Sequence, residues 1–479
     1  MTRTPRRNAP KSPPRRAPLR ARGSAVTPPQ VTAATSGTAA AAGGWVQDNA
    51  YGNLLSSLPW LLVATLVLRW DWLTSAPQLG QQVGQAYGQD PFSRIIKLTM
   101  LGLSTFVVLR RISLARVELR ELNIMFCAFF VLVPLSALWS ISPADTLARF
   151  ISLITVTQIC FALTLAKWHM RRFQELMRPL VTAILAASFV VGILMPDWII
   201  EKGEGTLKDA WHGLVYSKNG FGQLAGFGVL LWTHAWLYER KRWWRAAPPL
   251  ALAAACLLLS RSSTSLLATM FSIAFLLLLF GLPDNMRRYL PFFVALFASI
   301  VLIYALAILK LIPGLDFFFS PIAALTGKDQ TFTARSQIWE IIEQHIKMAP
   351  LLGTGYGAFW IGPVPTSPSY VFLARMFGFY PTESHNGYLE IVNDLGYVGL
   401  ACLVGYIFVY VRQSLQLMRI ERSQGVLYLG LFFQTALINL SESTWLNINT
   451  PYQYLVMTFA TFAIARTLLQ TSLQRHFRV

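Results

Sequence analysis

The chain has 479 residues, of which 54% are hydrophobic and only 13% are charged, and its formal net charge is +19. Repeated apolar stretches of about 20 residues exclude an ordinary soluble domain and predict a polytopic membrane protein. A charge of this size would suggest nucleic acid as a partner of a soluble chain, but here the basic residues stand between the apolar stretches. They indicate membrane topology, and no nucleic-acid partner is expected.

Residues 1–45 form the first predicted segment, a basic tail. They are rich in Pro, Arg, Ala, Ser and Thr, and the first 22 residues contain eight basic side chains. Such a composition buries too little apolar surface to offset the entropy of ordering, so we expect disorder. The tail has no apolar core of its own and is not expected to be a cleaved signal peptide. We expect it in the cytoplasm, near anionic lipids.

About twelve apolar stretches follow and predict an all-α, polytopic integral membrane protein. Nine of them fall in residues 46–312 and three in residues 386–470, which leaves 471–479 as a short C-terminal tail. Their approximate limits are 52–69, 93–109, 121–139, 149–167, 179–197, 218–237, 246–260, 263–282, 289–312, 386–411, 424–440 and 450–470.

The basic residues predict how these spans are oriented. If the N-terminal tail is cytoplasmic, then 28 of the 41 Lys and Arg residues fall in the two tails and in alternate connections on the same side. This is the positive-inside pattern, and it predicts an even number of spans with both termini in the cytoplasm. The opposite face of the membrane then receives three substantial loops, about 70–92, 198–217 and 313–385, of which the last is the longest.

This loop is far longer than an ordinary connection, and loops of this length are usually functional or disordered. Ile338, Ile341, Ile342 and Ile346 recur at helical spacing, which predicts an amphipathic helix on the outer face that stops before Pro350. The following Gly-Thr-Gly-Tyr-Gly stretch has neither the preceding strand nor the Lys-Ser/Thr sequence of a nucleotide-binding loop. It predicts a tight turn.

Two arginines of the loop are candidates for binding an anion. Arg335 and Arg375 would lie on the outer face, against the prevailing charge bias, where a guanidinium can pair with phosphate or carboxylate through two N–H groups. The structural alternative is that each is a solvated charge or faces a lipid headgroup.

The strongest candidate site opens the tenth span. His385 and Asn386 stand at its outer end, and Glu390 and Asp394 follow on one helix face, about 6 to 14 Å further in. Ionisable groups in a span are functional candidates by default, although a structural salt bridge remains an alternative for Asp394. A neutral histidine, with an ordinary pKa near 6.5, could accept a proton from a substrate.

Three more polar clusters are predicted on the same face of the membrane. His212, Lys218 and Asn219 open the sixth span, Arg261 lies between the seventh and eighth, and Glu442 follows the eleventh. Residues far apart in sequence that share one face can assemble a site at the outer rim of a helix bundle. The sequence shows no metal-ligand cluster, and the four cysteines lie inside apolar stretches without the spacing of a metal site or disulfide framework.

Four blocks, in this order, resemble the O-antigen ligase and Wzy-type polysaccharide polymerase superfamily. They are LVYSKNGFGQLAGFG, SRSSTSLLA, ARSQIWEIIEQHIKMAPLLGTGYGAF and SHNGYLEIVNDLGYVGL. The resemblance covers roughly residues 120–465, and it is greatest to the exopolysaccharide polymerase branch, the ExoQ-like proteins. It implies a GT-C-like membrane glycosyltransferase that needs no metal or other cofactor and acts on undecaprenyl-diphosphate-linked oligosaccharides at the periplasmic face.

The resemblance also implies roles for individual residues. His385 would activate the acceptor hydroxyl or engage the diphosphate, Arg335 would bind the donor diphosphate, and Lys218 and Asn219 would line the same site. Membrane lipids and proteins that regulate chain length and export the polymer are the expected partners. Ligases often have arginine where this chain has His212, and their Ser-Arg block is offset here at Arg261, which favours a polymerase over a ligase.

Two alternatives stay open. One is an O-antigen ligase that transfers a lipid-linked glycan to lipid A-core. The other is a flippase or secondary transporter, which would also have about twelve spans but would place its binding groups near the bilayer midplane, often in a repeated half. Here the polar clusters lie at the outer rim.

Overall fold

The structure is a computed structural model that describes residues 91–165, 168–201, 209–215, 217–281, 286–296, 299, 329–362, 365, 367–372, 381–447 and 451–476. The chain divides into two units, Met1–Ala50 and Tyr51–Val479, and every described residue belongs to the second. Within these residues the regular structure is helical, apart from one isolated β-bridge between Ile200 and Trp211. The all-α prediction is therefore confirmed for the described part of the chain.

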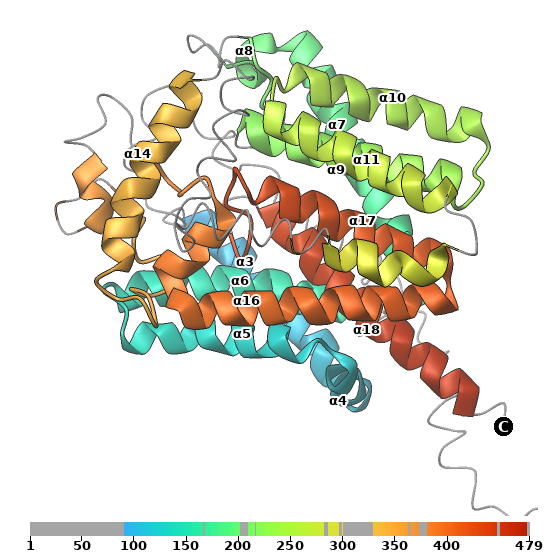
Figure 1. Cartoon of the computed structure of the whole chain (residues 1–479), viewed down its shortest axis with the longest axis horizontal. Helices are drawn as coiled ribbons and strands as arrows, with labels where there is room; N and C mark the ends of the chain where they lie inside the picture. The colour runs from blue at the N-terminus through green and yellow to red at the C-terminus, as the bar shows by residue number, and fades with distance from the viewer. Residues whose placement is uncertain are drawn as a thin grey trace, which may run out of the picture. The chain divides into compact units, whose positions relative to one another are not determined.

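Figure 1 shows the helices in chain order. They are α3 (Pro91–Arg110), α4 (Ile112–Glu121), α5 (Ile124–Leu135), η3 (Ser136–Leu138), α6 (Pro143–Leu165), α7 (Arg172–Leu194), α8 (Pro196–Ile199), α9 (Lys218–Leu237), α10 (Trp243–Leu259), α11 (Ser263–Gly281), η5 (Arg287–Tyr289), α14 (Asp329–Ile346), η6 (Pro368–Tyr370), α16 (Gly387–Ile420), α17 (Arg422–Ile438) and α18 (Pro451–His476). Ten of the expected spans overlap these helices: α3, α5, α6, α7, α9, α10, α11, α16, α17 and α18.

The described residues test the expected number of spans only in part. Four helices, α6, α7, α11 and α16, are long and apolar enough to cross a membrane, and α10 is apolar but shorter. A fifth span is possible if α4 and α5 count as one, although they are bent by 107°. The expected span at 52–69 and most of that at 289–312 lie outside the described residues.

The connection between the expected spans 93–109 and 121–139 is helical. It contains α4, which turns sharply into α5. Leu114, Ala115 and Glu118 lie on the buried face of α4, and arginines occupy its exposed side. Charge along the sequence marks a face of the membrane, but it does not decide whether the segment there is coil or an amphipathic helix.

The helix α16 is the element on which the candidate site is built. It packs against α5 and α17, and α14 crosses near its N-terminal part (Figure 1). At Gly396 the backbone leaves the helical region, with φ 63° and ψ −166°, so two helical pieces meet at a break. Only glycine adopts such a conformation without strain, and a Cβ at this position would overlap the Leu351 carbonyl.

The Gly-rich turn after α14 satisfies the backbone groups that this break frees. The N–H groups of Tyr397 and Val398 donate to the carbonyls of Pro350 and Leu351, at 2.9 and 3.1 Å. In return, the N–H of Gly355 donates to the Asp394 carbonyl at 3.0 Å. The N–H of Ala358 donates to the Gly355 carbonyl at 3.0 Å, so the predicted tight turn is confirmed, and the bonds to Pro350, Leu351 and Gly355 attach this segment to the broken helix.

Candidate active site

Asn386 fixes the N-terminus of α16. Its Oδ1 accepts hydrogen bonds from the backbone N–H groups of Tyr388 and Leu389, at 3.0 and 3.1 Å, which is the geometry of a helix N-cap. Its own N–H donates to the Ser443 hydroxyl at 3.2 Å. The buried Nδ2 has no partner among the described residues. Asn386 is thus a structural cap whose amide nitrogen is the one part left for a ligand.

Backbone hydrogen bonds hold the turn that follows α17 next to His385. His385 has a left-handed backbone with φ 53°, a strained conformation for a residue with a side chain. Beside it, the Gly387 N–H donates to the carbonyls of Asn439 and Glu442, at 2.9 and 3.1 Å. A Cβ at Gly387 would overlap the Asn439 side chain, so this approach requires glycine. The result is that Glu442 lies beside His385.

The helix α14 places Arg335. Its buried isoleucines, predicted from their spacing, pack against apolar side chains of α16 and of the loop 351–372. Trp339 donates through Nε1 to the Ser384 carbonyl at 2.9 Å, directly before His385. Near the end of α14, His345 pairs with Asn393 at 2.9 Å, and burial lowers the pKa of His345. Arg335 stands one turn before Trp339 and so reaches the start of α16.

Three side chains from separate segments meet at Glu442. Its Oε1 accepts hydrogen bonds from Arg335 Nη2 and from Asn219 Nδ2, both at 2.9 Å. Its Oε2 lies 3.5 Å from Nδ1 of His385, and that nitrogen lies 3.3 Å from Oε1 of Glu383. The Glu442 side chain is 5% exposed and the His385 side chain 23%. The cluster is therefore closed around the carboxylate and open at the histidine.

These contacts decide the charge of the histidine. Burial alone would lower the pKa of His385, but the carboxylates of Glu383 and Glu442 raise it to about 10. Burial would also raise the pKa of Glu442, yet His385, Arg335 and Asn219 together hold it below its usual value. Burial raises the pKa of Glu383, opposed by His385. His385 is thus an imidazolium at neutral pH, whereas the sequence suggested a neutral base.

Glu390 and Asp394 serve the scaffold around this cluster. Glu390 accepts from Trp360 Nε1 at 2.7 Å and from the Ser384 N–H at 2.8 Å, so it ties the loop to the residue before His385. Asp394 accepts from the Gly357 N–H at 2.7 Å. Among the described residues, neither carboxylate forms a hydrogen bond or an ion pair with His385.

The other predicted residues are placed as follows. His212 lies in a turn, where its Nδ1 is 3.0 Å from the Gly213 carbonyl oxygen. Arg261 is exposed and lies 4.0 Å from Asp209, and Lys218 is the first residue of α9, next to Asn219. Arg375 lies outside the described residues. Of the candidates, the structure brings Arg335, His385, Asn219 and Glu442 together.

Sequence reasoning missed Glu383 and Asn447. Glu383 accepts a hydrogen bond from Asn447 Nδ2 at 3.0 Å, which turns its other oxygen toward His385. The available signal was its position two residues before the histidine in a polar run. Asn447, five residues after Glu442, had no signal of its own.

One group in the described part of the chain could hold a metal ion. The ligand atoms of Glu383, His385 and Glu442 all lie within 4.8 Å of one another. However, Glu442 Oε1 already accepts from Arg335 and Asn219. A metal ion at this group would have to displace the proton of His385 and compete with Arg335 and Asn219 for Glu442.

Comparison with known proteins gives the class. A family model described as O-antigen ligase matches residues 248–404, which include Glu383, His385 and Arg335 but neither Asn219 nor Glu442. Together with the apolar helices, this match defines an integral membrane protein similar to the ligases and polymerases of polysaccharide biosynthesis.

A particular relative is the exopolysaccharide production protein ExoQ of Rhizobium meliloti (strain 1021). The chain is 28% identical to it over 291 residues, which cover 58% of this chain and 61% of ExoQ. The aligned region thus spans less than two thirds of the relative. These comparisons confirm the resemblance to the O-antigen ligase and Wzy-type polymerase superfamily and to its ExoQ-like branch.

Proposed function

We propose that this protein is a glycosyltransferase that polymerises undecaprenyl-diphosphate-linked oligosaccharide repeat units into a surface or exopolysaccharide. The observation that carries the proposal is the convergence of Arg335, His385, Asn219 and Glu442 at one end of α16. Two partly exposed cations that share Glu442 are suited to a diphosphate leaving group, on which negative charge develops as the glycosidic bond forms.

The reaction is a displacement at the anomeric carbon of the donor sugar. The acceptor hydroxyl oxygen forms a bond to this carbon, the bond from the carbon to the diphosphate oxygen breaks, and undecaprenyl diphosphate leaves with the electron pair. The hydroxyl loses its proton. The protein has to position two substrates, stabilise the leaving anion and accept one proton.

The charge of each side chain in the cluster indicates its role in this reaction. Arg335 donates to Glu442 alone among the described residues, so further N–H groups of its planar guanidinium can reach phosphate oxygens. His385, held protonated by its two carboxylates, adds a second positive charge. Glu383, whose pKa burial raises, lies next to His385 and is the group we assign to accept the hydroxyl proton. Glu442 and Asn219 keep Arg335 and His385 in place.

This assignment requires no metal ion, because the two side-chain cations perform the electrostatic task that a divalent metal performs in other glycosyl transfers. We place the reaction at the periplasmic face of the bacterial inner membrane, with both termini in the cytoplasm, because Arg335, Glu383 and His385 lie in the long loop 313–385, on the side poor in basic residues. Proteins that set chain length and export the polymer are the proposed partners.

Product analysis tests the proposal and separates it from its alternatives. Purified protein supplied with lipid-linked repeat units should yield longer lipid-linked chains. Transfer of the glycan to added lipid A-core instead would identify a ligase. Movement of the lipid-linked unit between the leaflets of a vesicle, with no new glycosidic bond, would identify a flippase and exclude glycosyl transfer.

A further inference from the structure

A second charged cavity lies at the far end of the α16–α17 hairpin. It has a volume of about 300 Å³ and is lined by residues of α11, of 288–291, of α16 and of α17. His385 precedes the first residue of α16 and Arg419 stands near its last, so the helix separates the two sites by up to about 50 Å. No part of the proposed glycosyl transfer uses this cavity.

The lining combines cations with an apolar floor. Arg288, Arg419 and Arg422 are its charged members, and none of the nine lining residues is acidic. The remaining six are Leu279, Leu290, Pro291, Leu415, Met418 and Val426. Arg422 is tied to the Leu279 carbonyl, whereas the side chains of Arg288 and Arg419 are exposed. Such a site offers guanidinium groups to an anion and apolar surface to whatever is attached to it.

The surroundings indicate what is attached. Next to the lining on α11, Leu278 and Phe280 are exposed, and so are Phe292 and Phe293 on the helical residues 290–296. Exposed large apolar side chains on both sides of a cavity, in a protein with membrane-spanning helices, are the surface expected to face acyl chains. These exposed side chains adjoin lining residues of the cavity, so acyl chains that pack on them would lie next to its arginines.

We propose that this cavity binds the headgroup of an anionic phospholipid, with the phosphate between Arg288, Arg419 and Arg422 and the acyl chains along the apolar flanks. Basic pockets at the cytoplasmic ends of membrane helices are suited to such headgroups, since the anionic lipids face them. The positive-inside pattern puts these arginines on the cytoplasmic side. The site is independent of the proposed glycosyl transfer.

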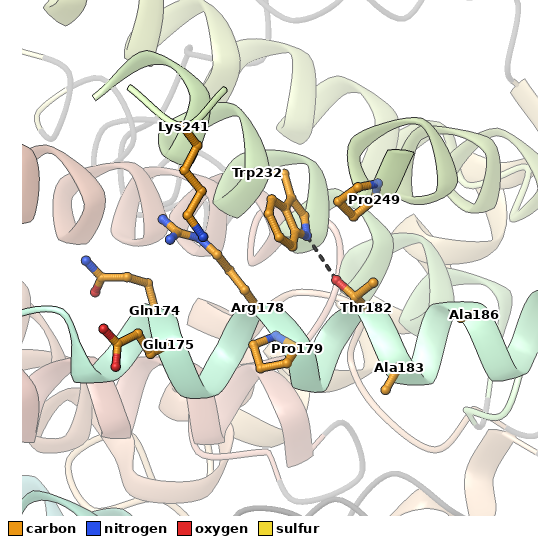
Figure 2. A pocket seen from close by; sticks show the side chains of 10 residues that line it. All are labelled: Gln174, Glu175, Arg178, Pro179, Thr182, Ala183, Ala186, Trp232, Lys241 and Pro249. Carbon is orange, nitrogen blue, oxygen red and sulfur yellow. Dashed lines mark hydrogen bonds between the residues drawn. The ribbon is translucent and has the colours of Figure 1, made fainter. Parts of the chain in front are cut away.

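A larger cavity of the described residues provides a contrast. Figure 2 shows Arg178 and Lys241 near Trp232 in a cavity of about 600 Å³ between α7, α9 and α10. Arg178 forms hydrogen bonds of 2.7 Å with both carboxylate oxygens of Glu239, so its charge is already compensated. Glu239 thus compensates the charge of Arg178 in the larger cavity. None of the nine residues that line the smaller cavity is a carboxylate that could compensate its arginines.

The test is a lipid titration of the purified full-length protein followed by native mass spectrometry. The probes are phosphatidylglycerol, phosphatidylcholine and inorganic phosphate. Phosphatidylglycerol should bind at least about tenfold more tightly than phosphatidylcholine, because the electroneutral headgroup of phosphatidylcholine has no net electrostatic attraction to the arginines. In Arg288→Gln/Arg419→Gln, which keeps the structural contact of Arg422, this affinity should fall about ten- to thirtyfold.

The matched control is Arg116→Gln/Arg120→Gln, which removes two exposed arginines from α4 and should leave the affinity unchanged. The single variant Arg419→Gln, which alters one exposed side chain, should show an intermediate loss if the double variant fails to fold. Equal binding of the two lipids, or equal losses in the variants and the control, would overturn the proposal. Inorganic phosphate that displaces phosphatidylglycerol at similar concentrations would show a site for free anions instead.

Discussion

Replacing Glu442 with Gln tests the charge state that the cluster imposes on His385. The change keeps the shape and an oxygen for Asn219, but it removes one of the two carboxylates, at 3.3 and 3.5 Å, that act on the imidazole. The rise of the His385 pKa from 6.5 to about 10 corresponds to roughly 5 kcal/mol in favour of the protonated form. With one carboxylate gone, we expect the pKa to fall by roughly one to two units.

The assay is the pH dependence of kcat/KM for polymerisation, which reports the pKa values of the free enzyme. If protonated His385 is the active form, the wild-type rate falls as the pH rises through about 10, and the Glu442→Gln rate falls at a lower pH. The pairing of protonated His385 with Glu383 and Glu442 also stabilises the fold. This contribution to the free energy of unfolding is complete below pH 6.5 and is lost as the pH rises through about 10. Glu340→Gln, at an exposed position of α14, is the control and should keep the wild-type profile. A rate that increases through this range would show a neutral histidine base and refute the reasoning.

Three further outcomes are expected. Arg335→Lys keeps the charge but loses the planar donor set, so KM for the lipid-linked donor should rise about tenfold or more in steady-state assays, and an unchanged KM would exclude Arg335 from diphosphate binding. Gly396→Ala should destabilise the protein by roughly 1–3 kcal/mol in detergent melts, because of its φ of 63° and the overlap with Leu351, while Gly102→Ala, where space is open, should not. EDTA should leave polymerisation intact, and loss of activity that Mg²⁺ restores would contradict the charge assignment at Glu383 and Glu442.

Sequence periodicity predicted most helices because apolar runs of membrane length carry a strong signal. The range 218–237 matches α9 at both ends, and the isoleucine spacing in the long loop predicted α14. The break at Gly396 could not be predicted, since a lone glycine in an apolar run is compatible with a continuous helix. Its conformation depends on backbone partners from Pro350 and Leu351, which are distant in sequence.

The candidate site was predictable as a set of polar blocks but not in its electrostatics. His385, Asn219 and Glu442 stood out as polar groups at the ends of apolar spans, and Arg335 stood out as an outer-face arginine that runs against the charge bias. The charge of His385 depends on two carboxylates. The sequence analysis overlooked Glu383, and Glu442 lies 57 residues after His385 in the sequence. Only tertiary contacts turn an expected neutral base into an imidazolium.

Chain-length analysis of the polymer made by wild type and His385→Ala, at matched amounts of purified protein, tests most directly whether this cluster performs glycosyl transfer. The account predicts that the variant, which lacks one of the two cations, elongates lipid-linked repeat units about 10²- to 10³-fold more slowly, while Glu390→Gln, which alters a scaffold contact, has a milder effect. Polymer of wild-type length and rate from His385→Ala would contradict it, and the reaction would then have to occur elsewhere in the chain.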